Sequence, residues 1–447
     1  MMDPIKMIET IQKYIQFVEE NNITNYDQIK ASINNEELNR DESNHLNTVI
    51  SKLLNPNEDY DIYNDGTILS SKYTAVVINT PTEKQFRKIK KNYDKIRAIE
   101  SHPQRSPGWY ASRNNAVTAS DLGCVLNLNK YEPPYKFVLK KIFGSDFKTN
   151  DACYYGKKFE TACVRNYEKL NDCIVEEFGL LPHPDYSFIC ASPDGIVNPF
   201  DKNGNKSPLA SRMVEIKCLA SRVLNHTGDI YDHICPKYYY CQIQQQLQTC
   251  NIKECDFIQY KIYEYNNRQE YLDDTHPEFD YKSRVSNLER GVLIELMPTR
   301  LEEHEYSKDS QNQQSIYEHA THVYPPRMEM THNEMNEWIL TELDNLKTKY
   351  NVKLNKIIYY RVMDRNHTLI VRDDEWFEKY FGVITKTWNY VLFLRDNREI
   401  AEKWKNFIES LKMKNNNKIM DYLEKLYNEN NRLDNEEEIK ITFKTPK

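Results

Sequence analysis

Three charged side chains in two neighbouring segments have the types and spacing needed for metal-assisted chemistry. Asp194 lies in the tight turn Ser192-Pro193-Asp194-Gly195, and the segment from Met213 to Cys218 contains Glu215 and Lys217. If that segment is a strand, Glu215 and Lys217 point to one face, because successive side chains alternate. Mg²⁺ prefers one or two carboxylates plus water and phosphate oxygens. Such an ion activates water for attack on a phosphodiester, and a neighbouring lysine orients or deprotonates that water. We therefore take Asp194 and Glu215 as candidate metal ligands and Lys217 as a candidate catalytic residue.

A simpler explanation fits each of these segments alone. A half-buried strand with one solvated face also reads Glu-x-Lys, and a turn containing Asp194 also joins the strands of an ordinary hairpin. Residues 198–211 between the two segments are rich in Asn, Lys, Gly and Pro, so we expect them to form the tip of a hairpin. Only the combination of both segments favours a site.

Two further polar side chains are candidates for the same site. The run Gly156-Lys157-Lys158-Phe159-Glu160 is expected to open a helix, so Glu160 lies near its start and either adds a third carboxylate or favours the helix dipole. After Pro236, helical spacing places Gln242 and Gln246 on one face. Such a face is usually polar surface, but beside a metal and a lysine an amide can position water or bind phosphate.

These motifs, in this order, resemble the lambda-type exonuclease group of the PD-(D/E)XK nucleases, also called the YqaJ-like viral recombinase family. The resemblance covers about residues 105–265. The residues that carry it are Trp109 with Arg113, Thr118-Ala119-Ser120, Gly156 with Glu160, Ser192-Pro193-Asp194-Gly195, Glu215-Ile216-Lys217-Cys218, and Tyr239 with Gln242 and Gln244.

The resemblance implies a role for each candidate residue. Asp194 and Glu215 would bind the metal and Lys217 would be the catalytic lysine, with Glu160 and Gln242 as further residues of the active site. It also assigns three residues to a terminal 5′-phosphate: Arg113, Ser120 and Lys130. We expect Ser120 to be a helix N-cap, and free N–H groups at a helix start together with a forked arginine suit an anion. Taken alone, Arg113 fits a surface ion pair and Ser120 an ordinary cap.

The activity implied by the resemblance is Mg²⁺-dependent hydrolysis of DNA, with Mn²⁺ able to substitute. We expect 5′-to-3′ degradation of double-stranded DNA from 5′-phosphorylated ends, which yields single strand for viral recombination and repair. A single-strand annealing protein and a homo-oligomer are the partners to test, and a large DNA virus is the expected source. Two alternatives stay open: a structure-specific endonuclease with the same site, and a non-catalytic DNA-binding recombination or packaging factor.

The elements that must position these residues fall into four regions. Together they predict an α/β (α+β) restriction-endonuclease-like core with a mixed central sheet and two extensions. The predicted regions are a helical N-terminal region at 1–100, the PD-(D/E)XK nuclease core at 101–265, a polar insertion or loop at 266–330, and an α+β C-terminal region with a mobile tail at 331–447.

Outside the core, hydrophobic spacing predicts several individual elements. Thr80-Pro81-Thr82-Glu83 is typical of a helix start with a capping box. The expected elements are helices near 8–18, 46–53 and 83–96, a helix capped at Thr331, a hairpin of strands 356–362 and 368–371, and a helical segment containing Trp376, Phe377 and Trp388. The lysines on the outer face of the helix near 83–96 are expected to be solvated, and His319 and His322 have the wrong spacing for a zinc helix.

Composition bounds the class of protein. The 447 residues are 39% hydrophobic and 28% charged, which indicates a folded chain. The net charge of -7 does not exclude a DNA partner, because phosphate is bound by a local basic patch and not by the total charge. The ten cysteines contain no C-x-x-C pair, so we expect reduced, mostly buried thiols. No apolar run reaches the roughly 20 residues of a membrane span, and the N-terminus lacks a signal peptide. We expect an intracellular protein, in the cytoplasm or viral replication site of a host cell or in the virion.

Overall fold

The computed structural model describes residues 70–71, 74–77, 80–144, 148–306, 313–349 and 351–431, all within one compact unit, Ser70–Lys447. The helices predicted near 8–18 and 46–53 and the tail beyond 431 lie outside the described residues. In the part of the chain that is described, no helix has the length and apolarity needed to cross a membrane.

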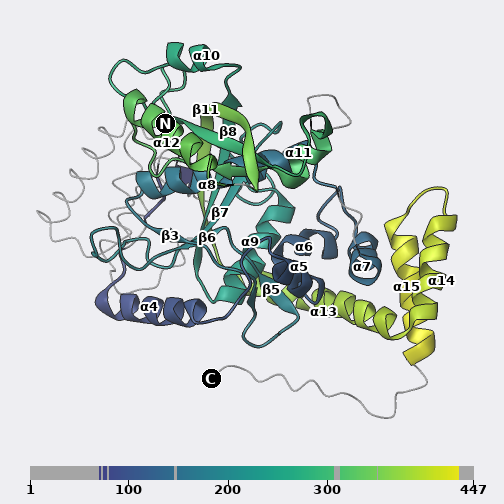
Figure 1. The fold of residues 1–447 in the computed structure, drawn as a ribbon. Helices are drawn as coiled ribbons and strands as arrows, with labels where there is room; N and C mark the ends of the chain where they lie inside the picture. Colours follow the sequence, from purple (N-terminus) through teal and green to yellow (C-terminus); the bar gives the residue numbers. More distant parts are fainter. Residues whose placement is uncertain are drawn as a thin grey trace, which may run out of the picture. The chain divides into compact units, whose positions relative to one another are not determined.

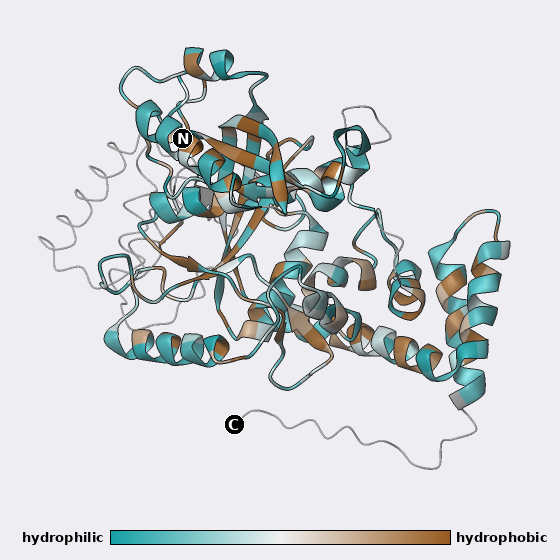
Figure 2. Cartoon of the chain, viewed as in Figure 1, coloured by the Kyte–Doolittle hydropathy of each residue, from teal (hydrophilic) through white to brown (hydrophobic). Residues whose placement is uncertain are grey.

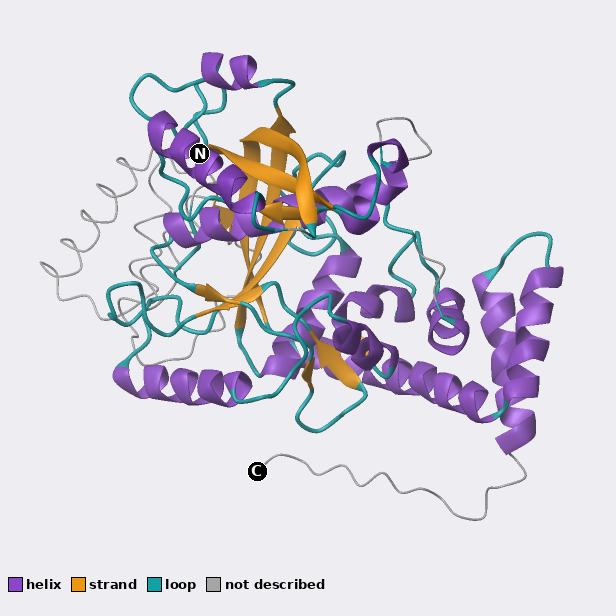
Figure 3. Ribbon diagram, in the orientation of Figure 1, coloured by secondary structure: helices purple, strands orange, loops and turns teal. Residues whose placement is uncertain are grey.

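A mixed sheet forms the centre of the fold (Figure 1, Figure 3). Its strand order is β10 (Thr321–Val323), β9 (Arg290–Pro298), β11 (Val352–Val371), β8 (Glu254–Glu264), β7 (Met213–Cys218), β6 (Gly195–Val197) and β3 (Val175–Glu176), with β1 (Ser70–Ser71) paired to β11. The pair β7 and β8 is parallel, and the other neighbours are antiparallel. A parallel pair needs a crossover, which α9 (Lys237–Cys250) supplies. The predicted mixed α/β class is confirmed.

Helices cover both faces of this sheet. On one face, α8 (Asp151–Leu170) packs Phe159, Cys163 and Tyr167 against Val214 and Ile216 of β7. On the other face, α9 and α4 (Glu83–Arg97) pack against Met213 of β7 and against Phe257 and Cys255 of β8. Alternate residues of β7 therefore face different helices, as a strand buried on both sides requires. Figure 2 shows the hydrophobic residues concentrated on these strands.

A second layer of short strands and helices lies beside the sheet. The strands β2 (Val117–Thr118), β5 (Ile189–Ala191) and β4 (Leu181–Pro182) form a small sheet. The helices are α5 (Pro107–Asn114), α6 (Ala119–Val125), α7 (Pro134–Phe143), α13 (Asp374–Asp396), α14 (Arg398–Ser410) and α15 (Asn416–Asn431). Phe137, Leu394 and Trp404 belong to one apolar core shared by α7, α13 and α14. The predicted helical segment with Trp376 and Trp388 is confirmed as α13.

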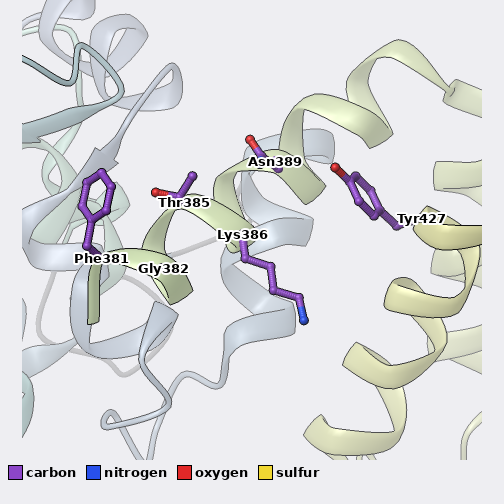
Figure 4. Close-up of a pocket in the computed structure, with 6 residues that line it drawn as sticks. All are labelled: Phe381, Gly382, Thr385, Lys386, Asn389 and Tyr427. Carbon is purple, nitrogen blue, oxygen red and sulfur yellow. The ribbon is translucent and has the colours of Figure 1, made fainter. Parts of the chain in front are cut away.

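A cavity of about 300 Å³ opens between two of these helices. It is lined by Phe381, Gly382, Thr385, Lys386 and Asn389 of α13 and by Tyr427 of α15 (Figure 4). None of the predicted site residues lines it.

The helix predicted near 83–96 is confirmed as α4, but its N-cap lies two residues later than expected. Thr82, not Thr80, is the N-cap, and it forms the capping box with Gln85. The Thr82 hydroxyl accepts from the Gln85 N–H, and the Gln85 side chain accepts from the Thr82 N–H at 2.8 Å. Glutamine satisfies the free N–H as glutamate would, so either register fits the sequence.

The expected hairpin at 356–371 is wrong, because these residues form the single strand β11. Asp364 to His367, predicted as the turn, pair in register with Lys261 to Ile258 of β8, and a bulge between Val362 and Asp364 absorbs the irregularity. Two of these polar residues have partners inside the fold: Arg365 forms a buried ion pair with Glu289, and Asn366 donates to the Asn225 carbonyl. The ring nitrogens of the buried His367 have no hydrogen-bond partner among the described residues.

The segment expected as a polar insertion or loop at 266–330 contains a central strand. In β9 every residue from Arg290 to Met297 is buried. The same segment forms α10 (Arg268–Asp273), a 3-10 turn (Glu303–Glu305), α11 (Gln313–His319) and β10, and it is followed by α12 (His332–Leu346), capped by Thr331 as predicted. Buried charges such as Arg290 and Glu295 have partners here. High polarity in this segment therefore does not indicate an exposed loop.

The packing of α8 on the sheet leads to a stability prediction. Phe159 is fully buried between α8 and the strands, so Phe159→Ala is expected to lower the free energy of unfolding by about 3–5 kcal/mol. Urea denaturation followed by circular dichroism measures this loss. Val383→Ala is the control, since Val383 is 45% exposed on α13, and a surface change of this kind costs within about 0.5 kcal/mol. Equal losses for both variants would contradict the described packing.

Candidate active site

The Glu215 carboxylate is fully buried on β7 and is surrounded by hydrogen-bond donors. Its Oε1 accepts from Lys217 Nζ and from Gln242 Nε2, each at 2.5 Å, and its Oε2 accepts from Gln246 Nε2 at 2.8 Å. The two glutamines lie four residues apart on α9, so both reach the same carboxylate. Glu215 is 0% exposed, so the alternative of a solvated charged face does not hold. Buried charges are retained only where they are paired and hydrogen-bonded.

Asp194 is held beside Glu215 by the turn that precedes β6. Its Oδ2 accepts from the backbone N–H of Ile216 at 2.7 Å, which ties the turn to the middle of β7. Gly195 follows, and a Cβ there would lie 2.2 Å from Val175, so the close approach of β3 requires glycine. Burial, together with the charges of Glu215 and Glu160, raises the pKa of Asp194 well above its usual range. Burial and the neighbouring carboxylates therefore disfavour the ionised form of Asp194.

Glu160 joins this group from the opposite face of the sheet, but not from a helix start. It lies in the middle of α8, which begins at Asp151, so the expected interaction with a helix dipole is wrong. The helix starts earlier because Asn150 caps it, accepting from the Cys153 N–H. Burial raises the pKa of Glu160 although its ion pair with Arg105, at 2.7 Å, opposes the shift.

Lys217 is a protonated donor in this arrangement. Burial alone would lower the pKa of Lys217, but the carboxylates of Glu215 and Asp194 outweigh burial and raise the pKa above its usual value. The ammonium also lies 4.8 Å from the ring centre of Tyr239, where a cation–π contact is favourable. A lysine held this way donates hydrogen bonds and cannot readily take up a proton.

The donor set fits a hard divalent cation bound by few protein ligands. The described residues contain no group of three or more His, Cys, Asp or Glu side chains arranged to hold a metal. Asp194 and Glu215 supply the two carboxylates that Mg²⁺ needs when water and phosphate complete its shell. Burial and the neighbouring carboxylates raise the pKa of Asp194 and so disfavour its ionised form, which a bound cation would favour.

The residues predicted to hold a terminal phosphate are only partly brought together. Arg113 Nη2 donates to Ser120 Oγ at 2.8 Å. Ser120 is not the N-cap of α6: Thr118 occupies that position, without a side-chain cap bond, and Ser120 lies inside the first turn. Lys130 is exposed on the loop before α7, with its ammonium 5.0 Å from the Tyr131 ring centre. Among the described contacts, none joins Lys130 to Arg113 or Ser120.

Two lysines of α7, Lys140 and Lys141, stabilise the segment that carries Arg113. Asp121 accepts from Lys140 at 2.6 Å and lies 3.0 Å from Lys141, whose ammonium also donates to the Arg113 carbonyl at 2.6 Å. Burial works against ionisation of Asp121, but the two lysines hold the pKa of its carboxyl below the usual range. These contacts fix the backbone that carries Arg113.

Trp109 links the Arg113 segment to the carboxylates. The Arg113 guanidinium lies 4.3 Å from the centre of the Trp109 ring, and Trp109 Nε1 donates to Ser192 Oγ at 3.3 Å. Because Ser192 and Asp194 share one turn, the motif containing Trp109 and the motif containing Asp194 meet in space. Motifs that are separated by 83 residues in the sequence therefore form one site.

Sequence reasoning missed Arg105 and Gln104. Gln104 Nε2 donates to the carbonyls of Phe178 and Pro193, each at 3.0 Å, so the loop before α5 is anchored to the turn containing Asp194. No local pattern marks these residues, because their partners lie 55 to 89 residues away. Gln246 was placed on the same face as Gln242, but only the structure joins it to Glu215.

The bond between Gln246 and Glu215 is testable through stability. Gln246→Ala leaves a buried carboxylate oxygen without its donor, so the free energy of unfolding is expected to fall by about 1–3 kcal/mol. Urea denaturation without added metal gives this value. Gln248→Ala is the matched control, since Gln248 lies on the same helix but bonds Asp374 in an exposed position. If Gln246→Ala costs no more than the control, Gln246 does not stabilise Glu215.

Comparison with known proteins agrees with the motifs. Residues 108–253 match the model of the YqaJ-like viral recombinase domain. An uncharacterized protein of Acanthamoeba polyphaga mimivirus is 33% identical over 346 residues, which are 76% of this chain and 62% of that protein. The uncharacterized protein YqaJ of Bacillus subtilis (strain 168) is 26% identical over 92 residues, or 20% of this chain and 29% of that protein. The chain thus spans less than two thirds of the length of either relative.

A solved structure gives a weaker likeness. The alkaline exonuclease LHK-Exo from Laribacter hongkongensis superposes with a TM-score of 0.36 at 17% identity, covering 66% of this chain and 99% of the exonuclease. A score this low adds no argument. The segment matched by the family model, residues 108–253, contains all the predicted site residues from Arg113 to Gln242.

Proposed function

We propose that the protein is a metal-dependent deoxyribonuclease that degrades DNA from its ends. The observation that carries the proposal is the fully buried Glu215 carboxylate, bonded by Lys217 and Gln242 and lying beside Asp194. Burying these charges lowers stability. A strand with a purely structural role would have no need of them. The match of residues 108–253 to a viral recombinase domain supports DNA as the substrate.

Asp194 and Glu215 would hold a Mg²⁺ ion, with Mn²⁺ able to replace it. When bound, this cation supplies charge stabilisation for the phosphate and an acidified water as nucleophile. The chain's own residues orient the reactants. Gln242 and Gln246 keep the Glu215 carboxylate in one position, and the Ile216 N–H does the same for Asp194. Pre-set ligands of this kind lose little entropy when substrate and metal bind.

Lys217 serves as a donor in this proposal. Because its pKa is raised, the ammonium is charged at neutral pH and does not accept the proton of the attacking water. A charged donor beside the reacting phosphate stabilises the negative charge that develops in the transition state. The proton of the water therefore has to leave to solvent or to a phosphate oxygen, with Glu160 as the further carboxylate near the site.

The direction of DNA degradation in this proposal is 5′ to 3′. Arg113 and Ser120 form a bonded pair at the start of α6, and Trp109 joins this pair to the turn of Asp194. Arginine and a hydroxyl are suitable donors for a terminal phosphate, and Lys130 would approach it from the loop before α7. A 5′-phosphorylated end held there sets the distance to the scissile bond. The product, a 3′ single strand, suits viral recombination through an annealing protein.

Substitutions at the carboxylates and lysine test the chemistry. Asp194→Ala, Glu215→Ala and Lys217→Ala should each reduce the cleavage rate of linear duplex DNA by about 10²-fold or more, because each removes a metal ligand or the charged donor. Rates are measured with Mg²⁺, Mn²⁺ and Ca²⁺ and after chelation. Mn²⁺ should support cleavage, Ca²⁺ should support binding with little turnover because of its looser geometry, and EDTA should stop the reaction.

The control for these variants is the exchange of Lys84, Lys88 and Lys91 for Gln on the exposed face of α4, which should leave the rate unchanged. Cleavage by Lys217→Ala at the control rate would contradict the role of Lys217. Cleavage of closed circular DNA would identify an endonuclease, and binding of DNA without any cleavage would identify a non-catalytic factor.

End chemistry tests the proposed phosphate contacts. A linear duplex with a 5′-phosphate should be degraded at least about tenfold faster than the same duplex with a 5′-hydroxyl, because a neutral hydroxyl lacks the negative charge and the paired oxygens that a phosphate offers to Arg113. Arg113→Ala should remove the difference between the two duplexes and keep slow, Mg²⁺-dependent cleavage. Initial rates of the wild type and the variant on both duplexes are compared. Equal wild-type rates on both ends would overturn the end-recognition proposal.

A further inference from the structure

We propose that Arg105 is a further residue of the active site, which holds Glu160 with one guanidinium nitrogen and binds the scissile phosphate with the others. This inference rests on the proposed function, since it assigns a contact to the DNA substrate of the same site. Three features of the molecule support it: the left-handed backbone at Arg105, the anchoring of its loop and the charge around Glu160.

The backbone of Arg105 is in the left-handed region, with φ at 66°. The described residues include seven non-glycine positions with positive φ, and five of them are Asn or Asp, which tolerate this region best. An arginine there costs conformational energy, and such strain gathers at functional sites because the surrounding structure has to enforce it. The left-handed backbone directs the Arg105 side chain toward Glu160, with which it forms an ion pair.

The loop that carries Arg105 is fixed to the turn that carries Asp194. Gln104 bonds the carbonyls of Phe178 and Pro193, so the residue before Arg105 is bonded to the residue before Asp194. The loop also packs closely on glycine: a Cβ at Gly179 would lie 2.3 Å from the His102 carbonyl oxygen. Arg105 and Asp194 are thus positioned by one set of contacts.

The Arg105 guanidinium keeps donors for a ligand. Nη2 bonds Glu160 Oε2 at 2.7 Å, and this is its single side-chain bond within the described residues. A guanidinium has five N–H donors and can bind a carboxylate along one edge and a phosphate along another. The Arg105 side chain is 44% exposed. The remaining donors are therefore accessible to DNA.

The charged groups around Glu160 favour a DNA phosphate next to Arg105 in this proposal. The Glu160 carboxyl is influenced by Lys217 and Glu215 as well as by Arg105, so the ion pair borders the carboxylates proposed to hold the metal. A phosphodiester entering between Asp194, Glu215 and Glu160 meets three carboxylates and needs cations beside it. Lys217 is bonded to Glu215, whereas the Arg105 side chain is 44% exposed and is accessible to the phosphate. An ordinary surface ion pair contributes little to stability, so it would not by itself offset the conformational cost at Arg105.

The first experiment compares substitutions at Arg105 with a matched surface arginine. Arg105→Asn removes the guanidinium and keeps the left-handed backbone, whereas Arg105→Lys keeps the charge without the fork. Arg97→Asn is the control, because Arg97 pairs with Glu176 at 3.6 Å on an exposed helix end. With Mg²⁺ and 5′-phosphorylated duplex, kcat for Arg105→Asn should fall by about 10²-fold, Arg105→Lys should be intermediate, and the control should be unchanged.

The second experiment asks whether Arg105 touches the phosphate itself. DNA binding is measured in Ca²⁺ with a normal duplex and with a duplex whose 5′-terminal linkage is a neutral methylphosphonate. The neutral linkage should weaken wild-type binding by about tenfold, and it should have almost no further effect on Arg105→Asn, because the two changes remove one contact. Multiplying losses would show that Arg105 acts elsewhere, and would overturn the inference.

The two proposals fail in different ways. If the wild-type protein cleaves no DNA with any divalent cation, the proposed nuclease function fails and this inference fails with it. If the wild type cleaves and both Arg105 variants cleave at the rate of Arg97→Asn, only the inference on Arg105 is overturned. Circular dichroism and a melting curve for each variant establish that the compared proteins are folded, and Arg105→Lys serves as the test if Arg105→Asn is not.

Discussion

The fold is organised around one buried negative charge, the carboxylate of Glu215 in the middle of β7. A carboxylate removed from water is costly unless donors surround it. Lys217 on the same strand and two glutamines on α9 supply those donors. This requirement fixes the face of α9 that meets the sheet, and α9 is also the crossover that makes β7 and β8 parallel. The element that compensates the charge is thus the one that sets the sheet topology.

The two faces of β7 have different surroundings. Val214 and Ile216 pack with Phe159 and Tyr167 of α8 in an apolar core, while Glu215 and Lys217 face α9. Apolar packing on the α8 side therefore holds the strand rigid, while Glu215 meets its glutamine donors on the α9 side and Glu160 of α8 joins the site from the other face. Rigid placement matters because a displacement of about 1 Å can cost 10²-fold in rate. Asp194 is tied to the same strand through the Ile216 N–H, so both proposed metal ligands move together.

Tyrosines and paired charges complete the interior of a chain with a modest share of hydrophobic residues. The sequence contains 32 tyrosines, and several are buried with their hydroxyls bonded. Tyr167 donates to Asp256 at 2.6 Å and Tyr260 donates to Asn166 at 3.0 Å. The buried pair of Arg365 and Glu289 lies within this same network through Asn166. Paired polar groups such as these specify the register of β8 and β11 more sharply than apolar contacts alone would.

The sequence by itself determined the features that depend on near neighbours. Alternation along residues 213–218, the turn at Asp194, the helix after Thr82 and the cap at Thr331 are local patterns, and the structure contains each of them. The order of the motifs also resembles the family whose model matches residues 108–253. These predictions succeeded because backbone geometry and capping are set within a few residues.

Only the tertiary structure decided the rest. That Glu215 is buried, that residues 364–367 continue a strand rather than turn, that α8 begins at Asp151 and that Arg105 meets Glu160 all depend on partners distant in the sequence. A polar segment has the same local preference whether its partner is water or a buried ion. The choice between the two is made by the free energy of burial and pairing, which exists only once distant segments pack together.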